Sequence, residues 1–189
     1  LGIIINDINR AYSGEKLEPE EYTSYDLALD NRDALNSDAY KNAENYYRSI
    51  FEKAGGSINF YPDKNGPVPT AETYHRETTE VSVQRVKDFC QKHGITENVF
   101  FIAAFGLTLG KYNFRKDAVF TTIYHGRNDS RLSETVGMLV KTLPVYCDFS
   151  GNAKDYLNGV QEQLINSMNN DIYPFSQISH EFNIKADAM

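Results

Sequence analysis

Apolar residues recur at helical spacing in several separate stretches of this chain. The first stretch, residues 1–12, places three isoleucines on one face and ends at Gly14, which predicts a helix there. Further helices are predicted over 21–31, 37–54, 82–93, 96–112, 157–168 and 175–182, with Ser37, Ser82 and Thr96 as N-caps. The helix after Thr96 is apolar on all sides, so we expect it to be the most buried one.

A different pattern occupies residues 117–146. The runs 118–124 and 139–146 consist almost entirely of β-branched, aromatic or other apolar residues, which predicts two strands with a polar loop between them. Pro144 lies inside the second run and cannot donate a ladder hydrogen bond, which indicates an edge strand or a bulge. A weak alternation over 74–81 predicts another strand, and the prolines within 57–73 predict a loop.

Helices interleaved with strands predict an α/β fold. The arrangement that we expect is a two-layer sandwich, in which the helices pack on a mixed sheet and the apolar helix after Thr96 lies against it. A length of 189 residues suits a single domain with a sizeable core.

Composition and charge exclude several classes of function. A net charge of −7 argues against nucleic acid as a partner, because binding phosphates would need a basic face. No apolar run approaches the roughly 18 residues of a membrane span, so no membrane partner is expected. Neither a glycine-rich phosphate loop nor a serine nucleophile elbow occurs, which disfavours nucleotide binding and hydrolase chemistry.

The cysteines and histidines lack metal-ligand spacing, so no metal site is predicted. Cys90 falls on the apolar face of a predicted helix and Cys147 in a predicted strand, so both are expected to pack in the core. Two cysteines that pack in the core fit a reducing cytoplasm, which is the expected location.

Four short motifs in a fixed order carry a resemblance to a known family. They are Tyr22-Thr23-Ser24-Tyr25, Gly126-Arg127, Val136-Gly137-Met138-Leu139-Val140-Lys141-Thr142-Leu143 and Tyr173-Pro174-Phe175-Ser176-Gln177-Ile178. In this order they resemble the C-terminal lobe of a condensation domain from a nonribosomal peptide synthetase, within the CoA-dependent acyltransferase-like superfamily. The implied fold is a chloramphenicol-acetyltransferase-like half domain. The chain departs from the family motifs at four positions: Ser24, Lys141, Tyr146 and Ser176.

The resemblance implies that the catalytic residues are not in this chain. In the family the signature His-His-x-x-x-Asp-Gly is followed by an apolar helix and a Tyr-x-Gly turn. This chain has such a helix from Leu1 onward and then reaches Tyr12-Ser13-Gly14, so the signature is expected upstream of Leu1. Residues 1–189 are therefore expected to form a partial condensation domain, without the N-terminal lobe that carries the catalytic histidine motif and without the extreme C-terminus. The lobe alone is expected to be inactive, whereas its parent is expected to be an amide-forming enzyme.

The resemblance also implies a substrate channel bordered by a bridging loop. The residues expected there are Gly126, Arg127, Gly137, Met138, Val140 and Thr142. Two interpretations of Arg127 stay open: a solvated side chain, or an ion pair across the lobes with the aspartate of the signature. His125 and Asp129 repeat the His-x-x-x-Asp spacing, but Tyr124 precedes this histidine and Ser130 follows the aspartate. We therefore interpret His125 as a loop histidine rather than a catalytic base.

The implied reaction joins two substrates tethered to carrier proteins. An acceptor aminoacyl thioester attacks a donor acyl or peptidyl thioester and forms an amide. No cofactor is expected to bind directly; the phosphopantetheine arms belong to the carriers. Expected partners are peptidyl carrier protein domains, the N-terminal lobe of the same domain and an adenylation domain in cis. Two alternatives stay open, namely an epimerisation or stand-alone acyltransferase relative and a degenerate, non-catalytic lobe that binds carrier proteins.

Overall fold

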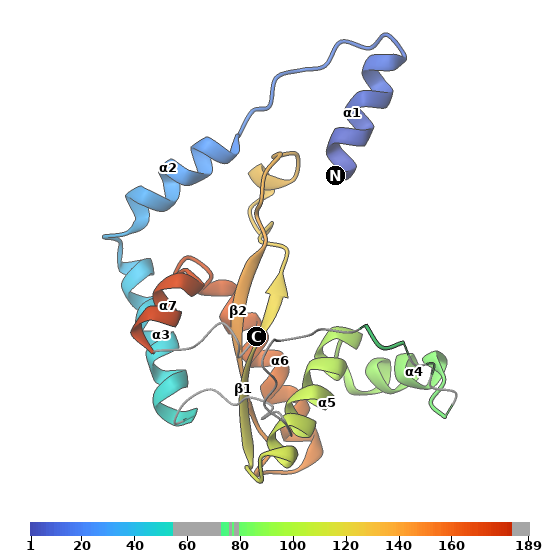
Figure 1. The fold of residues 1–189 in the computed structure, drawn as a ribbon, viewed down its shortest axis with the longest axis vertical. Helices are drawn as coiled ribbons and strands as arrows, with labels where there is room; N and C mark the ends of the chain where they lie inside the picture. The colour runs from blue at the N-terminus through green and yellow to red at the C-terminus, as the bar shows by residue number, and fades with distance from the viewer. Residues whose placement is uncertain (55–72, 76, 78–79, 183–189) are drawn as a thin grey trace, which may run out of the picture.

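The computed structural model describes residues 1–54, 73–75, 77 and 80–182. Helices dominate it, and two strands lie between the fifth and sixth helices (Figure 1). The elements in chain order are α1 (Gly2–Tyr12), α2 (Ser24–Ala34), α3 (Asp38–Ala54), α4 (Val83–His93), α5 (Glu97–Tyr112), β1 (Asp117–Tyr124), the 3-10 turn η1 (Ser130–Leu132), β2 (Lys141–Asp148), α6 (Ala153–Asn169) and α7 (Phe175–Glu181).

The predicted N-caps are confirmed. The side chains of Ser37, Ser82 and Thr96 each accept a hydrogen bond from the backbone N–H three residues later. The helix predicted over 21–31 begins at Ser24 instead, because Thr23 forms a capping box with Asp26 and so determines where α2 starts.

The two predicted strands form an antiparallel pair. Their register runs from Asp117 opposite Asp148 to Tyr124 opposite Lys141, so β2 starts two residues later than predicted. The strand predicted over 74–81 is not found among the residues described there, which lie in irregular structure. The loop predicted over 57–73 lies, apart from Thr73, outside the described residues.

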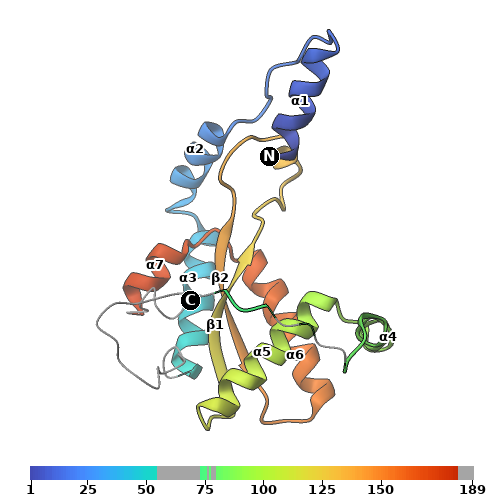
Figure 2. The ribbon, with the colours of Figure 1, turned by 45° about the vertical axis from the view of Figure 1, so that its right-hand side comes forward.

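Helices cover both faces of this sheet (Figure 1, Figure 2). On one face, Phe120 and Val145 contribute to a core with α5 and α6. On the other face, Val119 and Tyr146 pack with α3 and α7. The α/β class is confirmed. Among the described residues the sheet is an antiparallel pair with helices on both faces, because successive strand residues are apolar on both faces and each face therefore needs its own helices.

The apolar helix α5 has more buried residues than any other described helix, as predicted. It is nevertheless exposed along one stripe, where Phe101 is 59% and Phe105 45% accessible. Both cysteines are buried as unpaired thiols, which confirms their predicted place in the core. Burial also raises the pKa of the Cys147 thiol to about 12.

A buried polar network holds the outer edge of β2 at Pro144. The Pro144 carbonyl accepts a hydrogen bond from Ser167 Oγ of α6 at 3.0 Å. The nitrogen and carbonyl of one strand residue point to the same side, so the proline nitrogen also faces away from β1 and no ladder bond is lost. Ser167 is completely buried, and its hydroxyl lies 3.1 Å from Tyr46 Oη of α3. Among the described residues, β2 is thus an edge strand, as the proline predicted.

We expect the substitution Ser167→Ala to lower the free energy of unfolding by about 1–3 kcal/mol, because the buried Pro144 carbonyl loses its donor. Urea denaturation followed by tyrosine fluorescence measures this, since the chain has 13 tyrosines and no tryptophan. The exposed Ser49 also donates to a carbonyl, 2.7 Å away, and provides the matched control Ser49→Ala, with an expected change within about 0.5 kcal/mol. Equal losses in the two variants would contradict the role of burial.

Candidate functional site

The segment between the two strands, residues 125–140, is called the bridging loop below. It extends from the end of the β1–β2 pair, beyond the helices that cover the sheet, toward α1 and α2 (Figure 1, Figure 2). Five of the six residues predicted for the substrate channel lie in this loop, and Thr142 follows in β2. The bridging loop and the start of β2 together therefore hold all six predicted channel residues.

Gly126 makes the two ends of the bridging loop approach each other closely. It has a φ of +69°, in the left-handed region that side chains disfavour. A Cβ atom at this position would lie 1.8 Å from the carbonyl oxygen of Leu139. Both the backbone conformation and the available space therefore require glycine here.

Arg127 stabilises the bridging loop through hydrogen bonds to the loop's own backbone. Its half-buried guanidinium donates through Nη1 to the carbonyls of Leu132 and Thr135, the latter at 3.0 Å. Its backbone N–H donates to Nδ1 of His125 at 3.0 Å. Within the described structure the arginine thus bonds to its own loop instead of pointing into solvent, and an ion pair with another lobe stays a prediction.

The neighbouring histidine and aspartate each bond to other residues of the bridging loop. His125 is exposed and accepts the Arg127 backbone N–H. The carboxylate of Asp129 caps η1 and accepts two hydrogen bonds from the guanidinium of Arg131, at 2.6 and 2.8 Å. These bonds hold the pKa of Asp129 below its usual value. Both side chains are thus engaged within the bridging loop, and the interpretation of His125 as a loop histidine stays a prediction.

A short connector before α2 is tied to the bridging loop. Thr135 Oγ1 donates to the carbonyl of Tyr22 at 2.6 Å, and the Val136 N–H donates to Glu20 Oε1 at 2.7 Å. A Cβ atom on Gly137 would lie 3.0 Å from Cβ of Ser24, so the bridging loop also closely approaches the first residue of α2. We call these contacts the strap. They join segments that lie more than a hundred residues apart.

Charged groups add further contacts between the bridging loop and the segment around α2. Arg131 pairs with Asp30 of α2 at 3.1 Å, and its guanidinium lies 4.4 Å from the centre of the Tyr22 ring. Tyr22 Oη in turn donates to Asp30 at 2.6 Å. Burial, followed by this hydrogen bond, raises the pKa of Tyr22 to about 12, so its hydroxyl keeps its proton at neutral pH.

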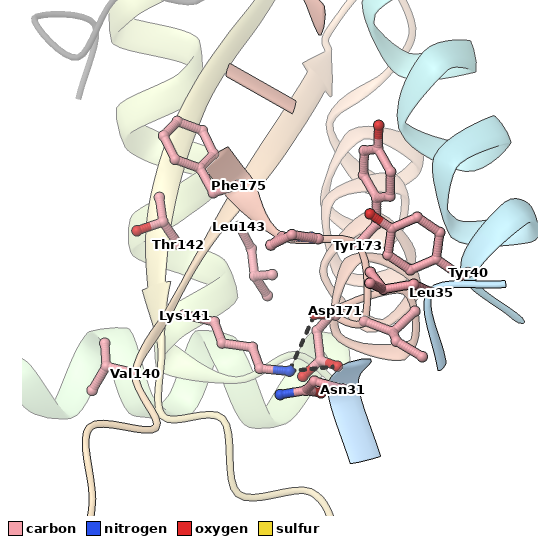
Figure 3. A pocket seen from close by; sticks show the side chains of 12 residues that line it. Asn31, Leu35, Tyr40, Val140, Lys141, Thr142, Leu143, Asp171, Tyr173 and Phe175 are labelled. Atoms are coloured by element: carbon pink, nitrogen blue, oxygen red, sulfur yellow. Dashed lines mark hydrogen bonds and ion pairs between the residues drawn. The ribbon is translucent and has the colours of Figure 1, made fainter. Parts of the chain in front are cut away.

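A cavity of about 380 Å³ opens where β2 begins (Figure 3). Within its lining, Lys141 Nζ donates to the backbone carbonyl of Asp171 and pairs with its carboxylate, both at 3.1 Å. The side chain of Asn31 lies beside this pair. The cavity is lined by Asn31, Leu35, Tyr40, Val140, Lys141, Thr142, Leu143, Asp171, Ile172, Tyr173, Pro174 and Phe175. Apolar walls around a few polar groups suit binding rather than acid–base chemistry.

The predicted channel residues do not line one common space. Val140 and Thr142 line the cavity just described. Arg127, Gly137 and Met138 border a second hollow of about 300 Å³ beside the N-terminal end of α1. Gly126 borders a third, of about 280 Å³, on the α2 side of the loop. The six residues are thus neighbours along one loop and strand, and they are shared among three hollows.

Leu1, upstream of which the catalytic signature is expected, also borders the second hollow. It is the N-cap residue of α1, makes no side-chain cap hydrogen bond and is 91% exposed. The three isoleucines predicted to share a face of this helix, Ile4, Ile5 and Ile8, are exposed as well. The described residues do not test where the signature lies, so its place before Leu1 stays a prediction. The structure does put the N-terminal end of α1 next to the bridging loop (Figure 1).

Sequence reasoning missed the polar residues of the cavity. The sequence marks Lys141 only as a departure from the family motif. Asp171 precedes the Tyr173-Pro174-Phe175 motif by two residues, so motif proximity was the one signal that pointed to it. The motif itself opens α7, with Pro174 as N-cap and Phe175 as the first helical residue. The Tyr173-Pro174-Phe175 motif therefore lies close to β2, which carries the end of the Val136–Leu143 motif.

Among the residues that the structure describes, no group of three or more histidine, cysteine, aspartate or glutamate side chains is placed to hold a metal ion. No helix there is both long and apolar enough to cross a membrane.

Solved condensation domains, which have the chloramphenicol-acetyltransferase-like fold, share this architecture. The family model described as "Condensation domain" matches residues 1–189. The chain therefore belongs to the condensation domain family.

Curated relatives are large synthetases. The chain is 25% identical to Bacitracin synthase 2 from Bacillus licheniformis over 194 residues, which cover 99% of this chain and 7% of that protein. It is also 25% identical to Gramicidin S synthase 2 from Brevibacillus brevis, over 98% of this chain and 4% of that protein. The chain thus spans only a small part of the curated relatives that it matches.

Solved structures share the fold at low sequence identity. SgcC5 from Streptomyces globisporus matches with a TM-score of 0.72 and 19% identity, over 100% of this chain and 44% of that one. The first condensation domain of the calcium-dependent antibiotic synthetase matches with a TM-score of 0.70 and 14% identity, over 92% and 39%. The X-domain solved in complex with OxyB from teicoplanin biosynthesis matches with a TM-score of 0.73 and 15% identity, over 99% and 45%.

Proposed function

We propose that this chain is the C-terminal lobe of a nonribosomal peptide synthetase condensation domain that joins two carrier-bound substrates through an amide bond. The observation that carries the proposal is the family match over residues 1–189. Relatives named as bacitracin and gramicidin S synthases support a role in making a peptide antibiotic. The proposed partners are peptidyl carrier protein domains, an N-terminal lobe and an adenylation domain, and the proposed location is the cytoplasm.

In this reaction the nitrogen of the acceptor amine attacks the carbonyl carbon of the donor thioester. The tetrahedral intermediate collapses, the carbon–sulfur bond breaks, and the phosphopantetheine thiolate leaves. The amine loses one proton and the thiolate gains one, so the step is balanced without a metal or a nucleotide. Much of the rate would come from holding the amine and the thioester together in one channel.

This chain would contribute walls and positioning rather than the base. Hydrogen bonds from Arg127 stabilise the bridging loop within itself, and the strap connects it to the segment before α2. Such a loop suits a rigid border for a channel. The cavity at Lys141 and Asp171 would lie where β2 leaves that loop. The base would come from the histidine signature that the family carries, upstream of Leu1.

A recruiting role is the second candidate. The observation that favours it is the likeness to the X-domain, which was solved in complex with OxyB. On that reading the parent would bind a partner protein without forming an amide. An epimerisation or stand-alone acyltransferase relative is not favoured over condensation by the family match.

The test is product formation by the parent protein supplied with donor and acceptor carriers loaded as thioesters, with the amide detected by mass spectrometry. We expect product, and we expect His125→Ala to leave its rate largely unchanged. Replacement of the second histidine of the upstream signature should abolish it. Binding of loaded carriers without product in the unaltered parent would favour the recruiting role. A loss of about 10²-fold or more in His125→Ala, the size of a general-base contribution, would instead identify His125 as the base.

A further inference from the structure

Thr135 is completely buried although most of the loop around it is exposed. Its hydroxyl donates to the carbonyl of Tyr22 at 2.6 Å and lies 3.2 Å from the carbonyl of Arg131. Its own carbonyl accepts a hydrogen bond from Arg127 Nη1 at 3.0 Å. One residue therefore connects the connector before α2, the η1 turn and the arginine that fastens the bridging loop.

The connector at the other end of this hydrogen bond is itself held in place. Tyr22 is bonded through its hydroxyl to Asp30 and lies under the guanidinium of Arg131. The next residue, Thr23, forms the capping box with Asp26 that starts α2. The Tyr22 carbonyl is thus held in a fixed position relative to α2. A hydrogen bond to this carbonyl therefore fixes the bridging loop relative to α2 as well.

We propose that Thr135 is a positioning residue that holds Arg127 and the bridging loop in register with α2, and so sets the shape of the channel. The inference rests on the proposed function for its consequence in catalysis, but the positioning itself does not depend on it. A hydroxyl is required at this position, because a valine of similar size would leave the Tyr22 carbonyl without its donor.

The experiment compares Thr135→Val with Thr135→Ser in the parent protein. Hydrogen exchange of the loop amides, residues 125–140, is measured by mass spectrometry, and amide formation is measured with loaded carriers. In Thr135→Val we expect exchange in the loop to rise about tenfold, as for the loss of one net hydrogen bond. Exchange in β1 and β2 should stay as in the unaltered protein. We also expect kcat/KM to fall about tenfold, with KM rising, and Thr135→Ser should restore both.

The matched control is Ser167→Ala, which also removes a completely buried hydroxyl but one bonded to Pro144 in the body of the domain. It should lower stability without raising exchange in the bridging loop. Unchanged loop exchange in Thr135→Val, or an equal rise in Ser167→Ala, would overturn the positioning role. Increased loop exchange with unchanged kcat/KM in an active parent would overturn the link to the channel. Increased exchange in a parent that forms no amide would leave Thr135 as the positioning residue and refute the proposed function instead.

Discussion

Replacing Gly126 by alanine is expected to disrupt the bridging loop more than any other single methyl group added to it. The positive φ of +69° costs about 1–2 kcal/mol for a residue with a Cβ atom. The overlap with the Leu139 carbonyl, 1.8 Å from the Cβ position, adds about 1–3 kcal/mol because the loop has to move. Urea denaturation measures the sum, and hydrogen exchange across residues 125–140 locates it.

Gly94 provides the control for this substitution. It has nearly the same φ, +65°, but a Cβ atom there would meet nothing within 4 Å. Gly94→Ala should therefore show only the conformational part of the loss. If Gly94→Ala and Gly126→Ala lose the same free energy of unfolding, the close approach to Leu139 does not matter and the described loop geometry is wrong.

Replacing Arg127 by alanine is expected to lower the free energy of unfolding by about 1.5–3 kcal/mol. The guanidinium is the donor to the carbonyls of Leu132 and Thr135, and both would lose a charge-assisted hydrogen bond. In the parent protein we also expect less folded enzyme and slower amide formation. Arg127→Lys should recover only part of the loss, because an ammonium lacks the planar fork of donors.

Arg32 provides the control for this prediction. It pairs with the adjacent Asp33, and both side chains are largely exposed, at 66% and 70%. Such a pair contributes about 0–1 kcal/mol, so Arg32→Ala should change little. An Arg127→Ala protein with an unaltered unfolding midpoint and unaltered activity would show that the loop does not need its internal fastening.

Local signals in the sequence predicted the secondary structure well, because they act over a few residues. A serine or threonine that caps its own helix, as Thr96 does, needs only the N–H three residues later. The same holds for the β-branched and aromatic composition of the two strands and for Pro144, whose missing donor restricts it to an edge. Where the prediction missed, as for the start of α2, an unnoticed local cap at Thr23 was responsible.

For the candidate site, the sequence predicts the stretch of chain that is involved, but not the residues from other segments that complete it. The family motifs point to the bridging loop, which includes Val140, and to Thr142, but not to the partners that complete the cavity. Lys141 meets Asp171 from 30 residues away, and no spacing rule connects them. The motifs also do not predict that these residues border separate hollows. A motif gives the order of residues along the chain, but not the side of the loop on which each residue lies.

Periodicity, caps and motif order in the sequence thus determine the helices, the strand pair and the membership of the condensation domain family. The tertiary structure alone decides that helices cover both faces of the sheet, that Gly126 has no room for a side chain, and that Thr135 reaches Tyr22 across 113 residues. The reason is physical. Hydrogen bonds and close packing between distant segments form only once the chain has folded, so they leave no periodic trace in the sequence.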